Sequence, residues 1–193
     1  TEVKVPENWK LAVDEEKPHA FHSKRADLEK FVNNVVEPVD AMKGDSLPVS
    51  AFMDYVDGTF PQGSSASEKR GVAVRVPVWH AENCVQCNNC SFVCPHATIR
   101  PYALTEEEAA KAPKQMKFTA KPAMKTDYKF TIAISPLDCM GCGVCVGVCP
   151  TKPESKALEM VPQATQADQQ EVFDWAVANV SEKELPYAVN TVK

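Results

Sequence analysis

The sequence predicts an α+β fold whose core consists of two similar halves, each carrying one cysteine-rich loop. Four cysteines lie within residues 84–94, and four more lie within residues 139–149. Each run is preceded and followed by a short apolar segment with strand character. The apolar share of 44% and the charged share of 24% are those of globular proteins. The 193 residues suffice for one domain of ordinary size, or for a small domain with long attachments.

The first predicted element is a helix over residues 23–37. Ser23 is its candidate N-cap, and Pro38 is expected to end it. Its apolar positions, which recur at helical spacing, are Leu28, Phe31, Val32, Val35 and Val36. Such an apolar stripe covers the local core more often than it docks on another domain or protein, and these are the two alternatives here. We assign residues 1–71 to a docking helix and an irregular linking segment.

Irregular chain is predicted from Gly44 to Arg70, where turn residues are frequent and no period persists. Loops of this length are uncommon in compact domains unless they are functional, disordered or packed on something else. The apolar residues of the segment argue against disorder. They are Leu47, Val49, Phe52, Met53, Tyr55 and Phe60. We therefore expect the segment to pack on a neighbour.

Strands are predicted before and after each cysteine run. Residues 72–80 and 130–134 precede the two runs, and apolar segments begin at Ala97 and Ala157 after them. The unit of strand, cysteine loop, short helix and strand thus occurs twice. This duplication predicts a ferredoxin-like core with pseudo-two-fold symmetry, which we place at residues 72–162.

An insertion at about residues 101–129 separates the halves. Thr105 and Glu108 form the pattern of a capping box that opens a short helix, and Pro113 ends it. The remainder, KQMKFTAKPAMKTDYK, is rich in lysine. It is either a solvated loop or a basic contact surface, and we favour the solvated loop because charge runs are mostly exposed.

Residues 163–193 are predicted to form a C-terminal helix followed by a polar tail. Thr165 is the candidate N-cap of this helix. The apolar positions of the helix are Val172, Trp175, Ala176 and Val180.

The two cysteine runs, CVQCNNCSFVCP from Cys84 and CMGCGVCVGVCP from Cys139, contain all eight cysteines. Both match C-x2-C-x2-C-x3-C-P, the bacterial pattern for [4Fe-4S] clusters. Disulfide scaffolds scatter their cysteines along small secreted chains, and structural zinc sites use two separated pairs. The sequence therefore predicts two [4Fe-4S] clusters, with zinc or three-iron variants as the alternatives.

The fourth cysteine of each run is expected to bind the cluster of the other run, as it does in two-cluster ferredoxins. Carrying this over predicts one cluster held by Cys84, Cys87, Cys90 and Cys149, and another held by Cys139, Cys142, Cys145 and Cys94. Cys90 and Cys94 lie four residues apart, a helical rise of about 6 Å. The two clusters should therefore be close neighbours.

Other residues of the runs are expected to shape the surroundings of the clusters. Gly141 and Gly143 would let backbone amides approach sulfide closely. A dry shell, which is equally well described as ordinary core, is expected from Val85, Phe92, Val93, Val144, Val146 and Val148. His96 is not expected to be a ligand, because four thiolates complete each site.

Several function classes are disfavoured by the composition. The net charge of -5, without a block of lysine and arginine, argues against nucleic-acid binding. No apolar run approaches the roughly 18 residues of a membrane span, and the first residues do not resemble a signal peptide. We expect a soluble, cytoplasmic chain, and the initial Thr1 suggests a processed chain or a piece of a longer one. No P-loop, GxGxxG or catalytic triad is recognisable, so the chain by itself should transfer electrons and catalyse nothing.

Two further stretches carry a family resemblance. They are GDSLPVSAF from Gly44, and DGTFPQGSSASEKRGVAVRVPVWHAENCVQCNNCSFVCPHATIRPY from Asp57. Together they resemble pyruvate:ferredoxin (flavodoxin) oxidoreductase, in which a Glu-Lys-Arg triplet, here Glu68, Lys69 and Arg70, stands just before the ferredoxin-like insert. The likeness spans most of the chain but corresponds to only one internal part of the family's long polypeptide.

The resemblance implies that the parent enzyme decarboxylates pyruvate oxidatively with coenzyme A, giving acetyl-CoA and CO2. It implies thiamine diphosphate, magnesium, coenzyme A and a third [4Fe-4S] cluster elsewhere in the parent, which is expected to be a homodimer. The two clusters of this chain would pass electrons to ferredoxin or flavodoxin. Two alternatives remain: an independent two-cluster ferredoxin that acts as a soluble carrier, and a structural zinc module.

Overall fold

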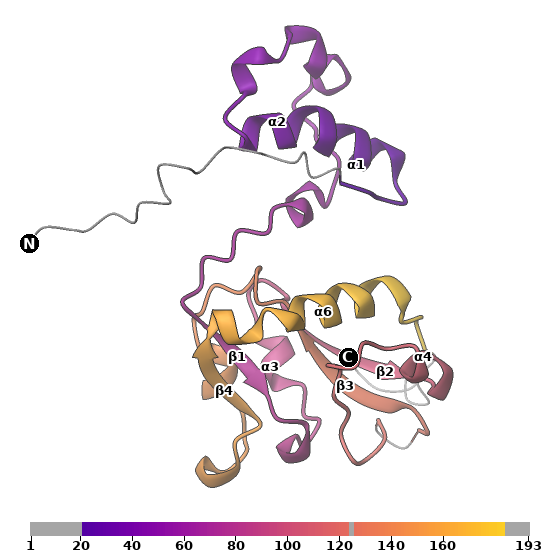
Figure 1. Ribbon diagram of the computed structural model, residues 1–193, viewed down its shortest axis with the longest axis vertical. Coiled ribbons are helices and arrows are strands. Elements are labelled where there is room, and N and C mark those ends of the chain that lie inside the picture. Colours follow the sequence, from indigo (N-terminus) through magenta and orange to yellow (C-terminus); the bar gives the residue numbers. More distant parts are fainter. Residues whose placement is uncertain (1–20, 124–125, 184–193) are drawn as a thin grey trace, which may run out of the picture. The chain divides into compact units, whose positions relative to one another are not determined.

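The computed structural model describes residues 21–123 and 126–183, and the chain divides into two compact units (Figure 1). The first unit is Thr1–Glu68 and the second is Lys69–Lys193. The assignment of a docking and linking role to residues 1–71 stays a prediction. Within the described residues, no helix has both the length and the apolar character needed to cross a membrane.

The predicted helix of the first unit consists of three consecutive helical segments. They are α1 (Ala26–Phe31), a π-helical segment (Val32–Val36) and α2 (Glu37–Asp40). The expectation that Pro38 ends the helix is wrong. The wider turn before it, in which the amide of Glu37 donates to the carbonyl of Val32, leaves Pro38 in the first turn of α2. Proline is tolerated there because a first-turn amide needs no intrahelical acceptor.

The predicted N-cap of this helix is also wrong. Arg25 occupies the N-cap position without a side-chain capping bond, and Ser23 instead accepts a hydrogen bond from the Arg25 amide through its Oγ. The apolar stripe nevertheless packs as expected for local core. Its buried members are Leu28, Phe31, Val32 and Val35.

Residues 44–70 contain no α-helix or strand, in agreement with the irregular chain that the sequence predicts. Three short 3-10 segments lie there: Gly44–Ser46, Val49–Tyr55 and Ser64–Ser67. Tyr55 and Phe60 pack on Phe31, with ring centroids 4.8 and 5.0 Å from the Phe31 centroid. Part of the apolar content of the segment therefore packs within its own unit, and packing on a neighbour stays a prediction.

The second unit contains two antiparallel strand pairs. Strand β1 (Arg75–Trp79) pairs with β4 (Leu158–Pro162), and β2 (Ile99–Leu104) pairs with β3 (Lys129–Ile134). The first strand of each half thus pairs with the last strand of the other half. Short helices follow the cysteine loops, α3 at Asn89–Phe92 and α5 at Val144–Gly147. The duplicated order of strand, cysteine loop, helix and strand is confirmed.

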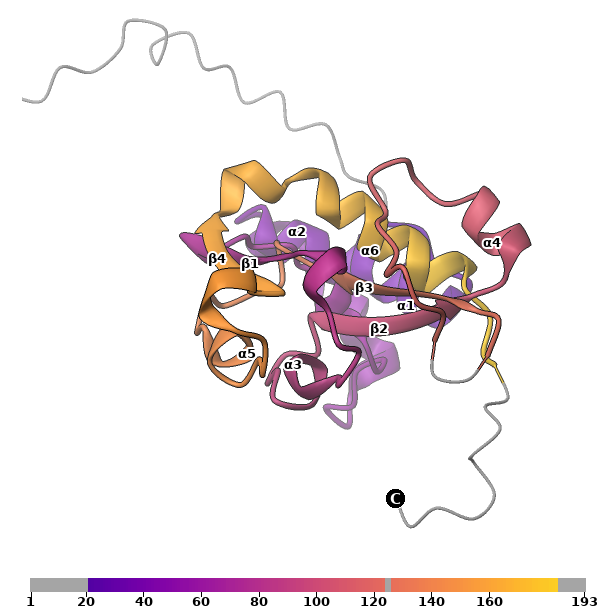
Figure 2. The ribbon, with the colours of Figure 1, turned by 90° about the horizontal axis from the view of Figure 1, so that it is seen from below.

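Strand β3 separates two parts of the core. Phe130, Ile132 and Ile134 share an apolar cluster with Cys90 and Cys145 on one side. On the other side, the buried residues that pack together are Leu104, Met116, Ala133, Val172, Phe173 and Ala176. In Figure 2 the strands accordingly lie between α6 (Asp168–Asn179) and the neighbouring pair α3 and α5.

Thr165 does not cap α6. It lies in a 3-10 turn (Gln163–Gln166) and donates its hydroxyl to the carbonyl of Pro162, while Ala167 occupies the N-cap without a side-chain bond. The helix is held by its apolar face on β3 instead. Packing of such a face, more than capping, supplies most helical stability in proteins.

The insertion is shorter than expected and is partly buried. Because β2 extends to Leu104 and β3 begins at Lys129, the insertion covers residues 105–128. The capping box of Thr105 and Glu108 is confirmed at the start of α4 (Glu106–Ala110). The remainder is not simply a solvated loop, because the side chains of Met116 and Ala123 are buried in the two core clusters.

The two cysteine loops share left-handed backbone at equivalent positions. Gln86 and Gly141, each two residues after the first cysteine, have φ of 57° and 71°. Asn88 and Gly143, two residues later, have φ of 60° and 75°. Glycine adopts this conformation without a steric penalty, and asparagine tolerates it better than most residues. The same loop shape is therefore built with different residues in the two halves.

The backbone of Gln86 is strained by its left-handed conformation, and hydrogen bonds made by its side chain offset this strain. The side-chain nitrogen Nε2 of Gln86 lies 2.9 Å from Thr119 Oγ1, 2.9 Å from the carbonyl oxygen of Lys121 and 3.3 Å from the carbonyl oxygen of Pro122. The hydrogen bonds tie the first cysteine loop to the insertion. The insertion therefore supports a backbone shape that the second loop obtains from glycine.

Replacing Gly141 with alanine should destabilise the second unit more than replacing Gly143. A Cβ on Gly141 would lie 2.9 Å from the Arg75 carbonyl oxygen and 3.2 Å from Ala73 Cβ, whereas at Gly143 nothing lies within 4 Å. Both variants incur left-handed strain of about 1–2 kcal/mol. Gly141→Ala should lose about 1–3 kcal/mol more through overpacking. Anaerobic urea denaturation followed by circular dichroism measures the difference, and equal midpoints for the two variants would contradict the close approach.

Candidate metal centre

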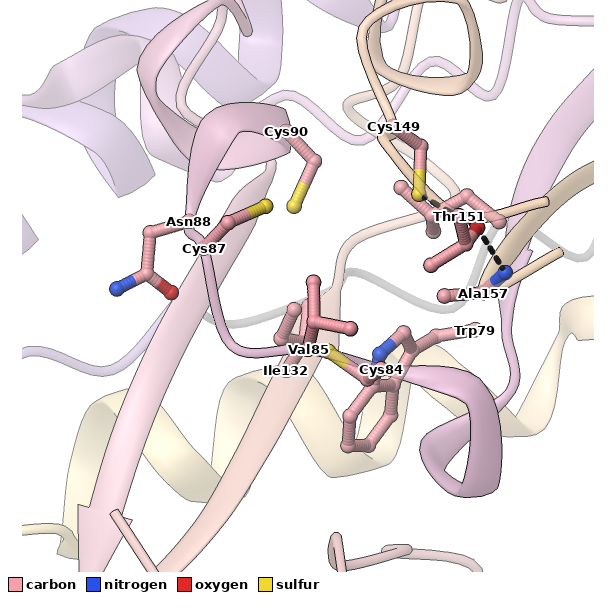
Figure 3. Close-up of a pocket in the computed structure, with 11 residues that line it drawn as sticks. Trp79, Cys84, Val85, Cys87, Asn88, Cys90, Ile132, Cys149, Thr151 and Ala157 are labelled. Carbon is pink, nitrogen blue, oxygen red and sulfur yellow. Dashed lines mark hydrogen bonds between the residues drawn. The ribbon is translucent and has the colours of Figure 1, made fainter. Parts of the chain in front are cut away.

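Four thiols from two distant parts of the chain surround one cavity. Cys84, Cys87 and Cys90, from the loop after β1 and the start of α3, line it together with Cys149, which follows α5. The space among the lining residues, including the part that is open to solvent, is about 310 Å³. Figure 3 shows the sulfur atoms of Cys87, Cys90 and Cys149 directed toward this common space.

A second cavity has the same composition with the halves exchanged. Cys139, Cys142 and Cys145, from the loop after β3 and the start of α5, line it together with Cys94, which follows α3. The space among its lining residues, again including the part open to solvent, is about 340 Å³ and so is close to that of the first cavity. All eight predicted site residues are thus divided into two groups of four, and each group takes three thiols from one run and one from the other.

The position of the fourth cysteine follows from the contact between α3 and α5. The two short helices lie beside each other on the same side of the strands (Figure 2). Each helix carries the third cysteine of its own run, and the fourth cysteine lies just beyond the end of the helix. The chain therefore passes from one set of four thiols to the other within about one helical turn. Four helical residues correspond to a rise of about 6 Å.

Backbone amides at the left-handed positions contact the first cysteine of each run. The Gln86 amide donates to Cys84 Sγ at 3.4 Å, and the Gly141 amide donates to Cys139 Sγ at 3.3 Å. Hydrogen bonds to sulfur stabilise negative charge on a thiolate. The positive φ angles of the two loops thus give both sites an equivalent donor.

Two threonines contact the fourth cysteines, and sequence reasoning missed both. Thr98 Oγ1 lies 3.3 Å from Cys94 Sγ, and Thr151 Oγ1 lies 3.2 Å from Cys149 Sγ. A signal was present in the sequence, since a threonine follows the Cys-Pro pair within a few residues in both runs. The spacing differs between the halves, so the pattern is not visible as a strict repeat.

Burial raises the pKa of three of the thiols. Desolvation is the main cause at Cys90, whose pKa rises to about 12, and at Cys145, whose pKa rises to about 11. The pKa of Cys139 is raised by burial as well. At Cys94 burial also acts to raise the pKa, but hydrogen bonds, chiefly from Thr98, bring it below the usual value. At neutral pH, thiols with a raised pKa stay protonated until a metal replaces the proton, so metal binding here would release protons.

One unpartnered donor on a residue that lines the first cavity fits a bound group that has hydrogen-bond acceptors. Trp79 Nε1 is buried and has no hydrogen-bond partner among the described residues, and Trp79 lines this cavity. A buried donor without a partner is costly, and an acceptor such as sulfide in the cavity would relieve that cost. The eight cysteines form no disulfide. Donor set and cavity together therefore suit an iron-sulfur cluster.

The expected dry shell is confirmed in part. Val85 lines the first cavity, and Val93 and Val144 line the second, although Val85 and Val144 are 62% and 46% exposed. Phe92 is 85% exposed and lines neither cavity. Further apolar lining comes from strands and their neighbours. In the first cavity it includes Trp79, Ile132 and Leu158, and in the second it includes Pro77, Ile99 and Met160. His96 lies at the second cavity but is exposed.

Two family models match the chain in separate parts. A model described as a 4Fe-4S dicluster domain matches residues 83–152, which include every cysteine. A second model, EKR, described as a domain of unknown function, matches residues 14–73. The first match agrees with the α+β content and with the two thiol groups described above.

Curated relatives cover nearly the whole chain. Pyruvate-flavodoxin oxidoreductases of Enterobacter agglomerans and Klebsiella pneumoniae are each 45% identical to it, over 99% and 100% of its length. Pyruvate:ferredoxin oxidoreductase of Moorella thermoacetica is 48% identical over 83% of the chain. The chain spans only 15%, 16% and 13% of the lengths of these three proteins. It therefore carries a 4Fe-4S dicluster domain and is homologous, along its whole length, to one segment of the pyruvate:ferredoxin (flavodoxin) oxidoreductases.

Proposed function

We propose that this chain is the electron-transfer segment of a pyruvate:ferredoxin (flavodoxin) oxidoreductase and holds two [4Fe-4S] clusters. The observation that carries the proposal is the pair of similar cavities, each lined by four thiols from both cysteine runs. Two clusters in one small domain, whose ligands share the contacting helices α3 and α5, would form a relay. When bound, each cluster can take up and release one electron at a time.

The proposed ligands are the members of the two cavities. One cluster would be held by Cys84, Cys87, Cys90 and Cys149, and the other by Cys139, Cys142, Cys145 and Cys94. The chain would contribute more than thiolates. Amides of Gln86 and Gly141 donate hydrogen bonds to ligand sulfur, and Ile132 and Leu158 keep part of the first cavity apolar.

The parent reaction is proposed from the relatives. It is the oxidative decarboxylation of pyruvate with coenzyme A to acetyl-CoA and CO2, with electrons delivered to ferredoxin or flavodoxin. Thiamine diphosphate, magnesium, coenzyme A and a third [4Fe-4S] cluster would bind elsewhere in the parent, which is proposed to be a homodimer. A cytoplasmic location stays a prediction. The functional division of the chain at residues 71 and 162 is likewise a proposal, and the boundary between the two compact units lies nearby, after Glu68.

An independent ferredoxin is the second candidate, because the dicluster domain match covers only residues 83–152. The identity to the oxidoreductases extends across the remaining residues, including the EKR match at residues 14–73. A free carrier would not require that similarity. A zinc module is disfavoured by the cysteine spacing, because each run has four cysteines at spacings of 3, 3 and 4 and not two separated pairs.

The anaerobically purified chain should contain two four-iron clusters, hence about eight iron atoms and about eight acid-labile sulfides per chain. The brown colour and a broad absorption between the near ultraviolet and the visible should accompany them. Iron, sulfide and zinc analysis measures this directly. One or more zinc ions per chain in place of iron would falsify the cluster assignment.

Crossed ligation can be tested with the fourth cysteines. Cys94→Ala should impair the cluster bound by Cys139, Cys142 and Cys145, because Cys94 lines that cavity. Cys149→Ala is the matched control and should impair the other cluster. Iron analysis and electron paramagnetic resonance of the reduced chains measure which signal is lost. If each variant resembles a variant of the first cysteine in its own run, Cys84→Ala or Cys139→Ala respectively, the crossed assignment is wrong.

The chain alone should not oxidise pyruvate, because clusters cannot stabilise the carbanion that forms on loss of CO2. It should accept electrons from a strong chemical reductant and reduce a ferredoxin or flavodoxin. Acetyl-CoA is assayed after mixing the chain with pyruvate, coenzyme A, thiamine diphosphate and magnesium, and acceptor reduction is followed optically. Acetyl-CoA formation by the chain alone, or no acceptor reduction by a chain with intact clusters, would contradict the relay role.

A further inference from the structure

We propose that the hydroxyls of Thr98 and Thr151 donate hydrogen bonds to the sulfurs of Cys94 and Cys149 and thereby raise the reduction potentials of two different clusters. The proposal rests on the crossed ligation proposed above. Each threonine is a positioning residue that acts through the one ligand which its cluster takes from the other cysteine run. The two hydroxyls therefore change the reduction potentials of the two clusters separately.

The surroundings of Thr151 fix the direction of its hydrogen bond. Its Oγ1 accepts the amide N–H of Ala157 at 3.0 Å, and it lies 3.2 Å from Cys149 Sγ. Figure 3 shows both contacts on the same oxygen. Because the Ala157 amide can only donate, the hydroxyl proton is free to point at the sulfur. Thr151 also lines the first cavity, so its hydroxyl lies beside the space that the cluster would fill.

Thr98 is held more rigidly and contacts its cysteine twice. The residue is 2% exposed, its Oγ1 lies 3.3 Å from Cys94 Sγ, and its own amide donates to the same sulfur at 3.4 Å. Its carbonyl accepts the amide of Ser135 at 2.8 Å, which anchors Thr98 to the chain after β3. A ligand thiolate has no proton, so the Thr98 hydroxyl must be the donor once a cluster is bound.

The sign of the effect follows from charge. Reduction adds one negative charge to the cluster and its thiolates, and a donated hydrogen bond stabilises the more negative form more strongly. Burial strengthens this effect, because little water is available to replace the hydroxyl. Removing the hydroxyl should therefore lower the potential of the cluster that the adjacent cysteine holds. Since the Thr98 amide remains in a Thr98→Val variant, that change reports the hydroxyl alone.

The test uses the full chain with its clusters in four variants: Thr98→Val, Thr151→Val, and Thr98→Ser and Thr151→Ser, which keep a hydroxyl. Thr131→Val is the matched control, because Thr131 is buried but its hydroxyl contacts no partner in the described residues. Potentiometric titration followed by electron paramagnetic resonance gives the two midpoint potentials. Iron and sulfide analysis of every variant comes first.

Each valine variant should lower one midpoint, and the two variants should lower different ones. The expected size is about tenfold in the reduction equilibrium constant, which is about 59 mV for a one-electron couple. Both serine variants should lie near the parent chain, and Thr131→Val should leave both midpoints unchanged. Loss of a cluster in a valine variant that its serine counterpart retains would also support the positioning role.

Intact clusters with unchanged midpoints would overturn this proposal and leave the relay untouched. A shift of the same midpoint by both valine variants, or serine variants that behave like valine, would overturn it as well. Loss of a cluster in both the valine and the serine variant would show that fit, not the hydroxyl, matters, and would count against it. A parent chain without iron and sulfide would overturn the proposed function together with this inference.

Discussion

The exchange of strands between the two halves is the constraint on which the metal centres depend. Because β1 pairs with β4 and β2 pairs with β3, neither half forms a sheet by itself. The pairing brings α3 and α5 together, so that the chain beyond each helix reaches the other half's thiols. If each half paired only within itself, Cys94 and Cys149 would have no reason to lie at the opposite cavities. The crossed arrangement is thus a consequence of strand order, and the helices only complete it.

Within that frame, backbone shape and burial prepare the thiols. The left-handed residues Gln86 and Gly141 direct their backbone amides toward sulfur. Gly141 adopts this conformation because it is glycine, whereas the conformation of Gln86 is supported by hydrogen bonds from its side chain to the insertion. Burial opposes ionisation of Cys90 and Cys145, so their thiolates would need the charge of bound iron for stability. The cavity walls are supplied by β-strand residues such as Ile132 and Leu158, which makes the sheet part of the site.

The first unit bears on the function of the chain in a way that the dicluster domain alone does not. Its helix and the 3-10 segments share an aromatic cluster around Phe31, yet Val49 and Val56 remain 88% and 78% exposed. The relatives are more than five times longer than the chain and match both units. A free electron carrier has no evident use for such a surface, whereas a segment of a large enzyme does. The similarity of residues outside the cysteine runs is for this reason the stronger indication of function.

The sequence by itself determined the chemistry of the sites, because cysteine spacing is local and both runs are complete. It also determined the strands, the irregular segment and the capping box at Thr105, all of which depend on nearby residues. Only the tertiary structure decided which side chains line the cavities: Phe92 turned outward, while Ile132 entered from a strand of the other half. It likewise decided that the helix continues past Pro38, through a widened turn with no sequence signature, and that Met116 of the insertion is buried. The roles of Thr98 and Thr151 also required it, because a hydrogen bond to sulfur depends on the fold around a cysteine and not on its spacing.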